Sequence, residues 1–118
     1  MQIFEGGKKG VHAGAVVERP VAELRPYPGN ARTHSKKQIR QIVASIERFG
    51  FVNPVLITEK RQIIAGHGRV EAARLLGWHS VPTLQISHLG EAERRAYILA
   101  DNKLALNAGW DSELLAIE

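Results

Sequence analysis

The stretch Ile63-Ile64-Ala65-Gly66-His67-Gly68-Arg69-Val70-Glu71-Ala72-Ala73-Arg74-Leu75-Leu76-Gly77 joins a short apolar run to a helical pattern through Gly-His-Gly-Arg. The apolar run predicts a buried strand. The two glycines permit a tight turn and let a ligand approach the backbone closely. A helix start offers N–H groups and the positive end of a dipole, which suit an anion. Arg69 adds a guanidinium that can donate two hydrogen bonds to a phosphate.

Two interpretations of this turn remain open from its spacing. In the first, Gly66, His67, Gly68 and Arg69 form a phosphate site. In the second, a strand-to-helix turn needs glycine for its backbone geometry alone, and Arg69 is a solvated side chain, because a lone Gly-x-Gly is a weak signal.

Composition narrows the class of protein. The chain has 118 residues, of which 44% are hydrophobic, so it is long enough for one globular domain. It has no cysteine, which excludes disulfides, thiolate metal sites and a thiol nucleophile, and fits a cytoplasmic protein. No apolar run approaches the roughly 20 residues that a membrane span requires. A net charge of +4 favours anionic partners such as nucleotides or nucleic acid.

The first half of the chain predicts an arm, a strand, a loop and a helix. Residues 1–14 are rich in glycine and predict a flexible arm, so the domain is expected over residues 15–118. A strand is expected over 15–18, stopped by Pro20, and the proline-rich residues 24–32 predict a loop.

The helix begins after the cap Ser35 and ends at Gly50. Its apolar residues recur at helical spacing. Its polar side carries Lys36, Lys37 and Arg40, which either contact DNA phosphates or are simply a solvated face. The apolar residues of this helix are Ile39, Ile42, Val43 and Ile46.

The second half predicts a hairpin, two helices and a strand. Residues 54–58 and 62–65 are β-rich runs joined by a charged turn, which indicates a hairpin. A helix is expected over about 69–76, capped by Gly77, and a strand over 81–86.

Pro82 inside that strand predicts an edge strand or a strand beginning. A third helix is expected from Glu91, interrupted by Asp101 and Asn102. Asp111 caps one more helix close to the last residue, which indicates a longer natural protein. The buried stripe of the third helix is expected to consist of Ala92, Ala96, Leu99 and Ala100.

Four strands and four helices in mixed order predict an α/β (α+β) domain, with a small mixed β-sheet and flanking helices. A hairpin that leads into the phosphate-like turn argues against a plain Rossmann unit, in which strand, turn and helix recur in parallel order.

Several ordered motifs resemble the N-terminal domain of the ParB family, within the ParB/sulfiredoxin superfamily. They cover about residues 15–105. The motifs are Pro26-Tyr27-Pro28-Gly29-Asn30-Ala31-Arg32, Ser45-Ile46-Glu47-Arg48-Phe49-Gly50, Pro54-Val55-Leu56-Ile57, Gly66-His67-Gly68-Arg69 with Ala72-Ala73 and Leu76-Gly77, Val81-Pro82, and Asp101-Asn102.

This resemblance implies a nucleotide site. In the family, the box at residues 66–69 cradles a triphosphate, and chromosome-partitioning members bind and hydrolyse CTP to close around DNA. Carried over, residues 66–69 would line the phosphates, and Asn30 and Arg32 would lie near the nucleotide. Asp101 and Asn102 would stand at the family's Glu-Asn pair, with Asn102 helping to hold Mg²⁺ through the nucleotide.

The chain departs from the family pattern in both boxes. His67 and Gly68 stand where the family has Glu and its first Arg, in Gly-Glu-Arg-Arg. The family's Glu-Asn-x-x-Arg is here Asp101-Asn102-Lys103-Leu104-Ala105, without the arginine. These departures argue against clamp-type CTP hydrolysis. Sulfiredoxin chemistry needs a cysteine in the turn, and the chain has none. The Gly-His-Gly-Arg form is more similar to the ParB-like "nuclease" domains associated with phage-type DNA methyltransferases.

Three functions follow as alternatives. The first is a domain that binds CTP or ATP with Mg²⁺ near DNA, as a switch or slow NTPase, with His67 and Asn102 as catalytic candidates. The second is a DNA-binding or nuclease accessory domain of a methyltransferase that lies C-terminal to this segment. The third is a small-molecule phosphotransferase, for which Glu47 or Glu71 would be the base. A homodimer stays open, and no zinc site is expected because the five histidines lack ligand spacing.

Overall fold

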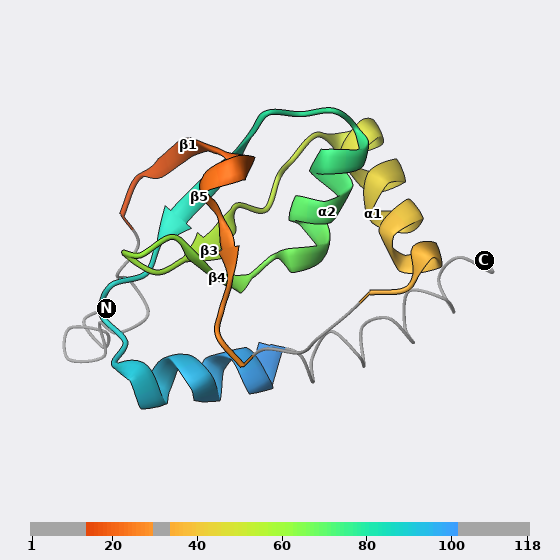
Figure 1. The fold of residues 1–118 in the computed structure, drawn as a ribbon. Helices are drawn as coiled ribbons and strands as arrows, with labels where there is room; N and C mark the ends of the chain where they lie inside the picture. The colour runs from red at the N-terminus through yellow and green to blue at the C-terminus, as the bar shows by residue number, and fades with distance from the viewer. Residues whose placement is uncertain (1–13, 30–33, 102–118) are drawn as a thin grey trace, which may run out of the picture.

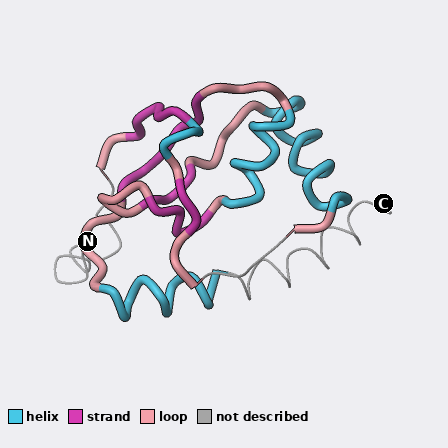
Figure 2. Tube along the Cα trace, viewed as in Figure 1, coloured by secondary structure: helices cyan, strands magenta, loops and turns pink. Residues whose placement is uncertain are grey.

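A computed structural model describes residues 14–29 and 34–101 of the chain (Figures 1 and 2). The core is one five-stranded sheet with the order β1-β5-β3-β4-β2. Its strands are β1 (Val16–Pro20), β2 (Arg25–Pro26), β3 (Val55–Ile57), β4 (Gln62–Ala65) and β5 (Ser80–Gln85). The helices are α1 (Lys36–Phe49), α2 (His67–Leu75) and a helix over 91–101, and a 3₁₀ turn, η3 (Val21–Glu23), follows β1.

The sheet is mixed, as the sequence predicts. β1 pairs antiparallel with β5, which runs parallel to β3. β3 and β4 form the expected antiparallel hairpin, and β4 runs parallel to β2. The prediction of a loop over residues 24–32 is wrong at β2. Two residues there extend along the edge of the sheet, where the Arg25 amide donates to the Arg61 carbonyl (3.1 Å).

The prediction that Pro82 marks an edge strand or a strand beginning is wrong, because Pro82 lies inside β5, between β1 and β3. The Ile86 amide donates to the Ile57 carbonyl, so the Ile86 nitrogen faces β3. Successive backbone nitrogens of a strand point alternately to its two neighbours, and Pro82 is an even number of residues from Ile86, so the Pro82 nitrogen also faces β3. Thr83 is opposite Val55, the first residue of β3. The Pro82 nitrogen therefore lies just before β3 begins, where the ladder needs no donor.

α1 has the predicted limits. The Ser35 hydroxyl accepts from the Gln38 amide (3.1 Å), and the Gln38 side chain accepts from the Ser35 amide (2.9 Å). This reciprocal pair is a capping box, which satisfies two amides at the helix start. Gly50 ends the helix with φ +86°, and its amide donates to the Ile46 carbonyl.

Helices cover both faces of the sheet (Figure 1). Val55 and Ile57 point to the face that α2 covers, where they join Val70 of α2 in the larger core cluster. Leu56 points the opposite way, as the two-residue period of a strand requires, into a second cluster that includes Ile98. α1 packs on α2, so α2 lies between α1 and the sheet.

The helix over 91–101 buries a different stripe from the predicted one. Ala92, Ala96, Leu99 and Ala100 are exposed, Leu99 by 70%, whereas Ile98 is 6% exposed. The sheet face beyond Leu56 and Ile64 accepts one large side chain, and Ile98 fills it. Asp101, the last described residue of this helix, is helical; Asn102, the second residue of the predicted interruption, and Asp111 lie outside the described residues.

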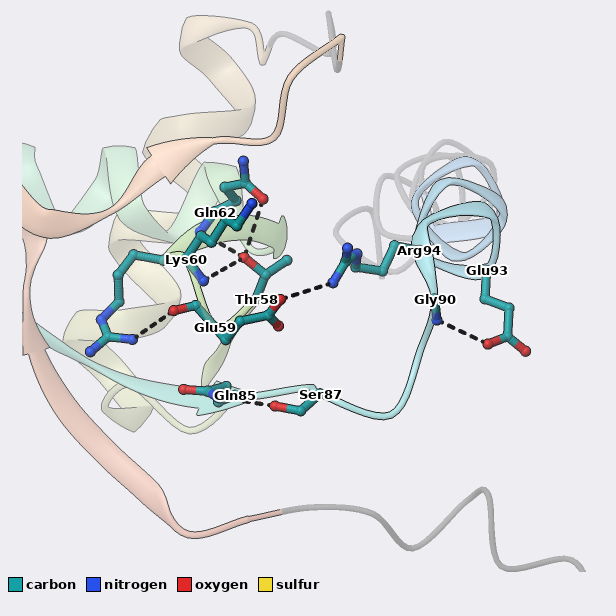
Figure 3. A network of polar contacts seen from close by, with 10 residues as sticks. Thr58, Glu59, Lys60, Gln62, Gln85, Ser87, Gly90, Glu93 and Arg94 are labelled. Carbon is teal, nitrogen blue, oxygen red and sulfur yellow. Dashed lines mark hydrogen bonds and ion pairs between the residues drawn. The ribbon is translucent and has the colours of Figure 1, made fainter.

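Polar contacts fix the beginning of this helix above the β3–β4 turn (Figure 3). The Arg94 guanidinium pairs with the Glu59 carboxylate at 3.6 Å, and the Gly90 amide donates to the Glu93 side chain. The buried Thr58 hydroxyl accepts from the amides of Lys60 and Gln62, which closes the turn. In the described part of the chain, no helix has the length and apolar character needed to cross a membrane.

Ile98→Ala is expected to lower the free energy of unfolding by about 2–4 kcal/mol, because it leaves a cavity in the second core cluster. Leu99→Ala, its matched control on the next residue, is expected to change it by less than about 0.5 kcal/mol. Urea unfolding of both variants measures the difference. A larger decrease for Leu99→Ala than for Ile98→Ala would mean that the helix faces the sheet with the stripe predicted from the sequence.

Candidate phosphate-binding cleft

The turn between β4 and α2 needs glycine at position 66 for two reasons. Gly66 has φ +111°, which side chains disfavour, and a Cβ there would lie 3.3 Å from the Val55 Cα and 3.0 Å from the Arg69 Nη2. α2 begins at His67, two residues earlier than expected. Its first intrahelical bond runs from the Val70 amide to the Gly66 carbonyl, so the amides of the first turn are oriented toward the helix start.

Arg69 is held in place and is not the solvated side chain of the alternative interpretation. Its Nη2 donates to the Pro54 carbonyl at 3.0 Å. Its Nε is buried without a hydrogen-bond partner among the described residues. Burial lowers the pKa of the guanidinium, while the negative charge of Asp101, and that of Tyr97 in its ionised form, oppose that shift. An arginine stays charged at neutral pH even so, and therefore Arg69 presents a partly desolvated positive charge.

This charge lies on the wall of a cleft of about 590 Å³. The cleft is lined by residues from α1, the loop that follows it, the turn at residues 66–69 and the last described residue of the helix over 91–101. Its lining residues are His34, Gln38, Gln41, Ile42, Ser45, Ile46, Gly50, Phe51, Val52, Asn53, Gly66, His67, Gly68, Arg69 and Asp101.

All four residues of the predicted phosphate turn line this cleft, and so does Asp101. Asp101 comes from the helix on the opposite face of the sheet, and its charge acts on both Arg69 and Tyr97. Burial raises the pKa of the Tyr97 hydroxyl, and Asp101 adds to that shift. Among the lining residues that the structure describes, Asp101 is the one carboxylate.

Gly68 has a packing role that its sequence position does not reveal. A Cβ there would lie 2.8 Å from the Ile42 Cδ1 and 3.0 Å from the His34 Nε2, so the glycine lets α1 and α2 approach closely. His34 thereby becomes a lining residue that the sequence patterns do not indicate. No spacing pattern links it to the turn, because the contact joins two segments that are distant in the chain.

The other predicted residues are outside the cleft or outside the described chain. Lys36, Lys37 and Arg40 are exposed on α1 and do not line the cleft. Asn30, Arg32 and Asn102 lie outside the described residues.

The two candidate bases for phosphotransfer do not line the cleft either. Glu47 is exposed, and Glu71 pairs on the surface with Arg74 at 3.4 Å. Over residues 14–29 and 34–101, no three His, Cys, Asp or Glu side chains converge as a metal site. The described cleft therefore brings together a helix start, a fixed guanidinium, two imidazoles and one carboxylate.

The chain is similar to several known sequences. The model of the ParB N-terminal domain matches residues 6–103. The ParB-like nuclease domain-containing protein YnaK of Escherichia coli K12 is 54% identical over 80 residues, which cover 68% of this chain and 92% of that protein. A nucleoid occlusion protein of Bacillus cereus AH187 is 30% identical over 92 residues, or 74% of this chain and 31% of that protein.

Two solved structures share the fold. One is the C-terminally truncated chromosome-partitioning protein ParB from Caulobacter crescentus complexed with CTP-gamma-S (TM-score 0.66, 25% identity, 75% of this chain and 53% of that chain). The other is sulfiredoxin from Arabidopsis thaliana (TM-score 0.56, 20% identity, 73% and 98%). The chain thus spans about half of that ParB structure and about a third of the nucleoid occlusion protein. The expected ParB/sulfiredoxin architecture is confirmed, and the chain belongs to the ParB N-terminal domain family.

Proposed function

We propose that this chain binds a nucleoside triphosphate, CTP or ATP, with its phosphates against residues 66–69. The observation that carries the proposal is the fixed, partly desolvated guanidinium of Arg69 at the start of α2, on the wall of an open cleft. Charge-assisted hydrogen bonds from arginine and a helix start together are a strong phosphate-binding combination. The similarity to the Caulobacter ParB complexed with CTP-gamma-S supports a nucleotide as the ligand.

The residues of the proposed site would contact different parts of the bound nucleotide. The first amides of α2 and Arg69 would hold phosphate oxygens, and His67 would donate from its imidazole. Asn30 and Arg32 would approach the nucleotide, and Asn102 would help to hold Mg²⁺, as the family resemblance implies. Bound magnesium would neutralise phosphate charge; in such sites it is held by the phosphates and one or two carboxylates, which fits the single carboxylate of Asp101.

The domain would act as a nucleotide-dependent switch or a slow NTPase in a cytoplasmic, DNA-associated setting. His67 and Asn102 are the candidates for a catalytic role. The helix over 91–101 links the cleft to the far side of the sheet, because Asp101 lines the cleft while Ile98 packs in the second core cluster. Occupancy of the cleft can therefore change the position of this helix, which would be the switching element. A homodimer is compatible with this mechanism.

A second candidate is a DNA-binding or nuclease accessory domain that serves a DNA methyltransferase of the phage type. The specific observation in its favour is the 54% identity to a relative named for a ParB-like nuclease domain. Exposed Lys36, Lys37 and Arg40 on α1 would contact the DNA backbone. This candidate differs from the first in its ligand, so direct binding measurements separate the two.

Arg69→Ala is expected to weaken nucleotide binding by about 10- to 150-fold, the equivalent of about 1.5–3 kcal/mol for a hydrogen bond to a charged group. Isothermal titration calorimetry with CTP, ATP and GTP in the presence of Mg²⁺ measures the change. Arg74→Ala is the matched control, because Arg74 lies on the same helix and pairs on the surface with Glu71. Circular dichroism establishes that each variant is folded. Absence of binding to all three nucleotides by the folded wild type would refute the proposal.

The DNA-binding candidate predicts that combined alanine substitutions at Lys36, Lys37 and Arg40 weaken binding to duplex DNA. If each side chain neutralises one phosphate, the slope of log K against log salt should fall by about 0.9 for each cationic side chain removed. Fluorescence anisotropy at several salt concentrations measures this slope. A triple alanine variant at Lys60, Arg74 and Arg95 removes the same charge elsewhere and is the control. Identical slopes for the two triple variants would rule out α1 as the DNA-binding element.

A further inference from the structure

We propose that His34 is a ligand-binding residue of the cleft, and that glycine at position 68 is what admits its imidazole. The inference rests on the proposed function, since it takes the ligand to be a phosphate-bearing anion. It adds a residue that the sequence motifs do not indicate, and it explains why glycine, rather than the family's arginine, stands at position 68.

The imidazole of His34 packs directly against Gly68. The position that a Cβ would take on Gly68 is 3.0 Å from the His34 Nε2 and 3.1 Å from its Cδ2. These distances are tighter than most contacts of real Cβ atoms, and the Ile42 Cδ1 lies closer still, at 2.8 Å, so a larger residue at position 68 would push both the imidazole and the Ile42 side chain away. The ring of His34 therefore occupies the space where a longer side chain at position 68 would begin, and glycine and histidine are complementary in volume.

His34 and Gly68 both line the cleft. His34 immediately precedes the capping residue of α1, and Gly68 is the second residue of α2, so the contact brings two helix starts together at one end of the cleft. His34, His67 and Arg69 line this region. Both helix starts and all three side chains favour negative charge, and a phosphate oxygen between them would meet donors from two helices.

Protonation of histidine sets the direction in which anion binding changes with pH. An imidazole gains a positive charge when it is protonated, ordinarily between about pH 8 and pH 6. Among the described residues that line the cleft, the charged side chains are Arg69 and Asp101, and those from α1 are uncharged. An anionic ligand favours the protonated imidazole, and therefore the contribution of His34 to binding must grow as the pH falls.

The test uses inorganic tripolyphosphate with Mg²⁺ as the probe, next to CTP and to cytidine, which carries no phosphate. His34→Ala is expected to weaken tripolyphosphate and CTP binding by about 10-fold or more at pH 6.5, because it removes a charged donor. The effect should shrink at pH 8. His34→Gln, which keeps a neutral donor of similar size, is expected to retain part of the affinity and to lose its pH dependence. His79→Ala, at an exposed histidine outside the cleft, is the control and should bind as the wild type does.

Gly68→Ala supplies an independent arm, because its methyl group crowds the imidazole, as well as the Ile42 side chain, while His34 stays in the sequence. It should weaken binding, and its effect should be smaller in the His34→Ala background than in the wild type, since part of it acts through the same ring. Wild-type affinity in folded His34→Ala would overturn the inference while leaving the proposed function intact if Arg69→Ala still weakens binding. If the wild type binds neither tripolyphosphate nor any nucleotide, both are overturned.

Discussion

The close approach of Gly66 to β3 is the constraint on which the site depends. With φ +111° and the Val55 Cα only 3.3 Å from where its Cβ would be, Gly66 turns the chain from β4 directly into α2. The same turn places Arg69 beside the carbonyl of Pro54, which fixes the guanidinium without enclosing it. One backbone conformation thus sets the direction of α2, the start of that helix and the position of the positive charge.

The cleft is completed by segments that are far apart in the chain. α1 supplies one wall because Gly68 lets it approach α2, and the helix over 91–101 supplies Asp101 at the other end. That last helix is held by Ile98 against the sheet and by the Arg94–Glu59 ion pair above the hairpin turn. The site therefore joins the two faces of the sheet, although the turn that defines it is short and local.

The features of the fold that neighbouring residues determine are the ones that the sequence predicts correctly. The cap Ser35, the helix stop at Gly50 and the β3–β4 hairpin are all encoded by neighbouring residues, and each has the predicted position. The predictions for Pro82 and for the buried stripe of the third helix are wrong because their environment depends on distant partners. Thr83, the residue after Pro82, pairs with the first residue of β3, and Ile98 packs against the sheet in place of the predicted stripe. In the site, Gly66 and Arg69 follow from the turn pattern, but His34 depends on a contact between α1 and α2, which no local pattern contains.

The charges of the cleft explain why a bound anion would need a cation as well. Asp101 favours the charged form of Arg69, so the two groups stabilise each other when no anion is bound. A phosphate near Arg69 would compete for the same guanidinium and would be repelled by the Asp101 carboxylate. Two arrangements remove that repulsion: a divalent cation between carboxylate and phosphate, or movement of the helix that carries Asp101. Both connect the occupancy of the cleft to the position of that helix, which is the physical requirement for a switch.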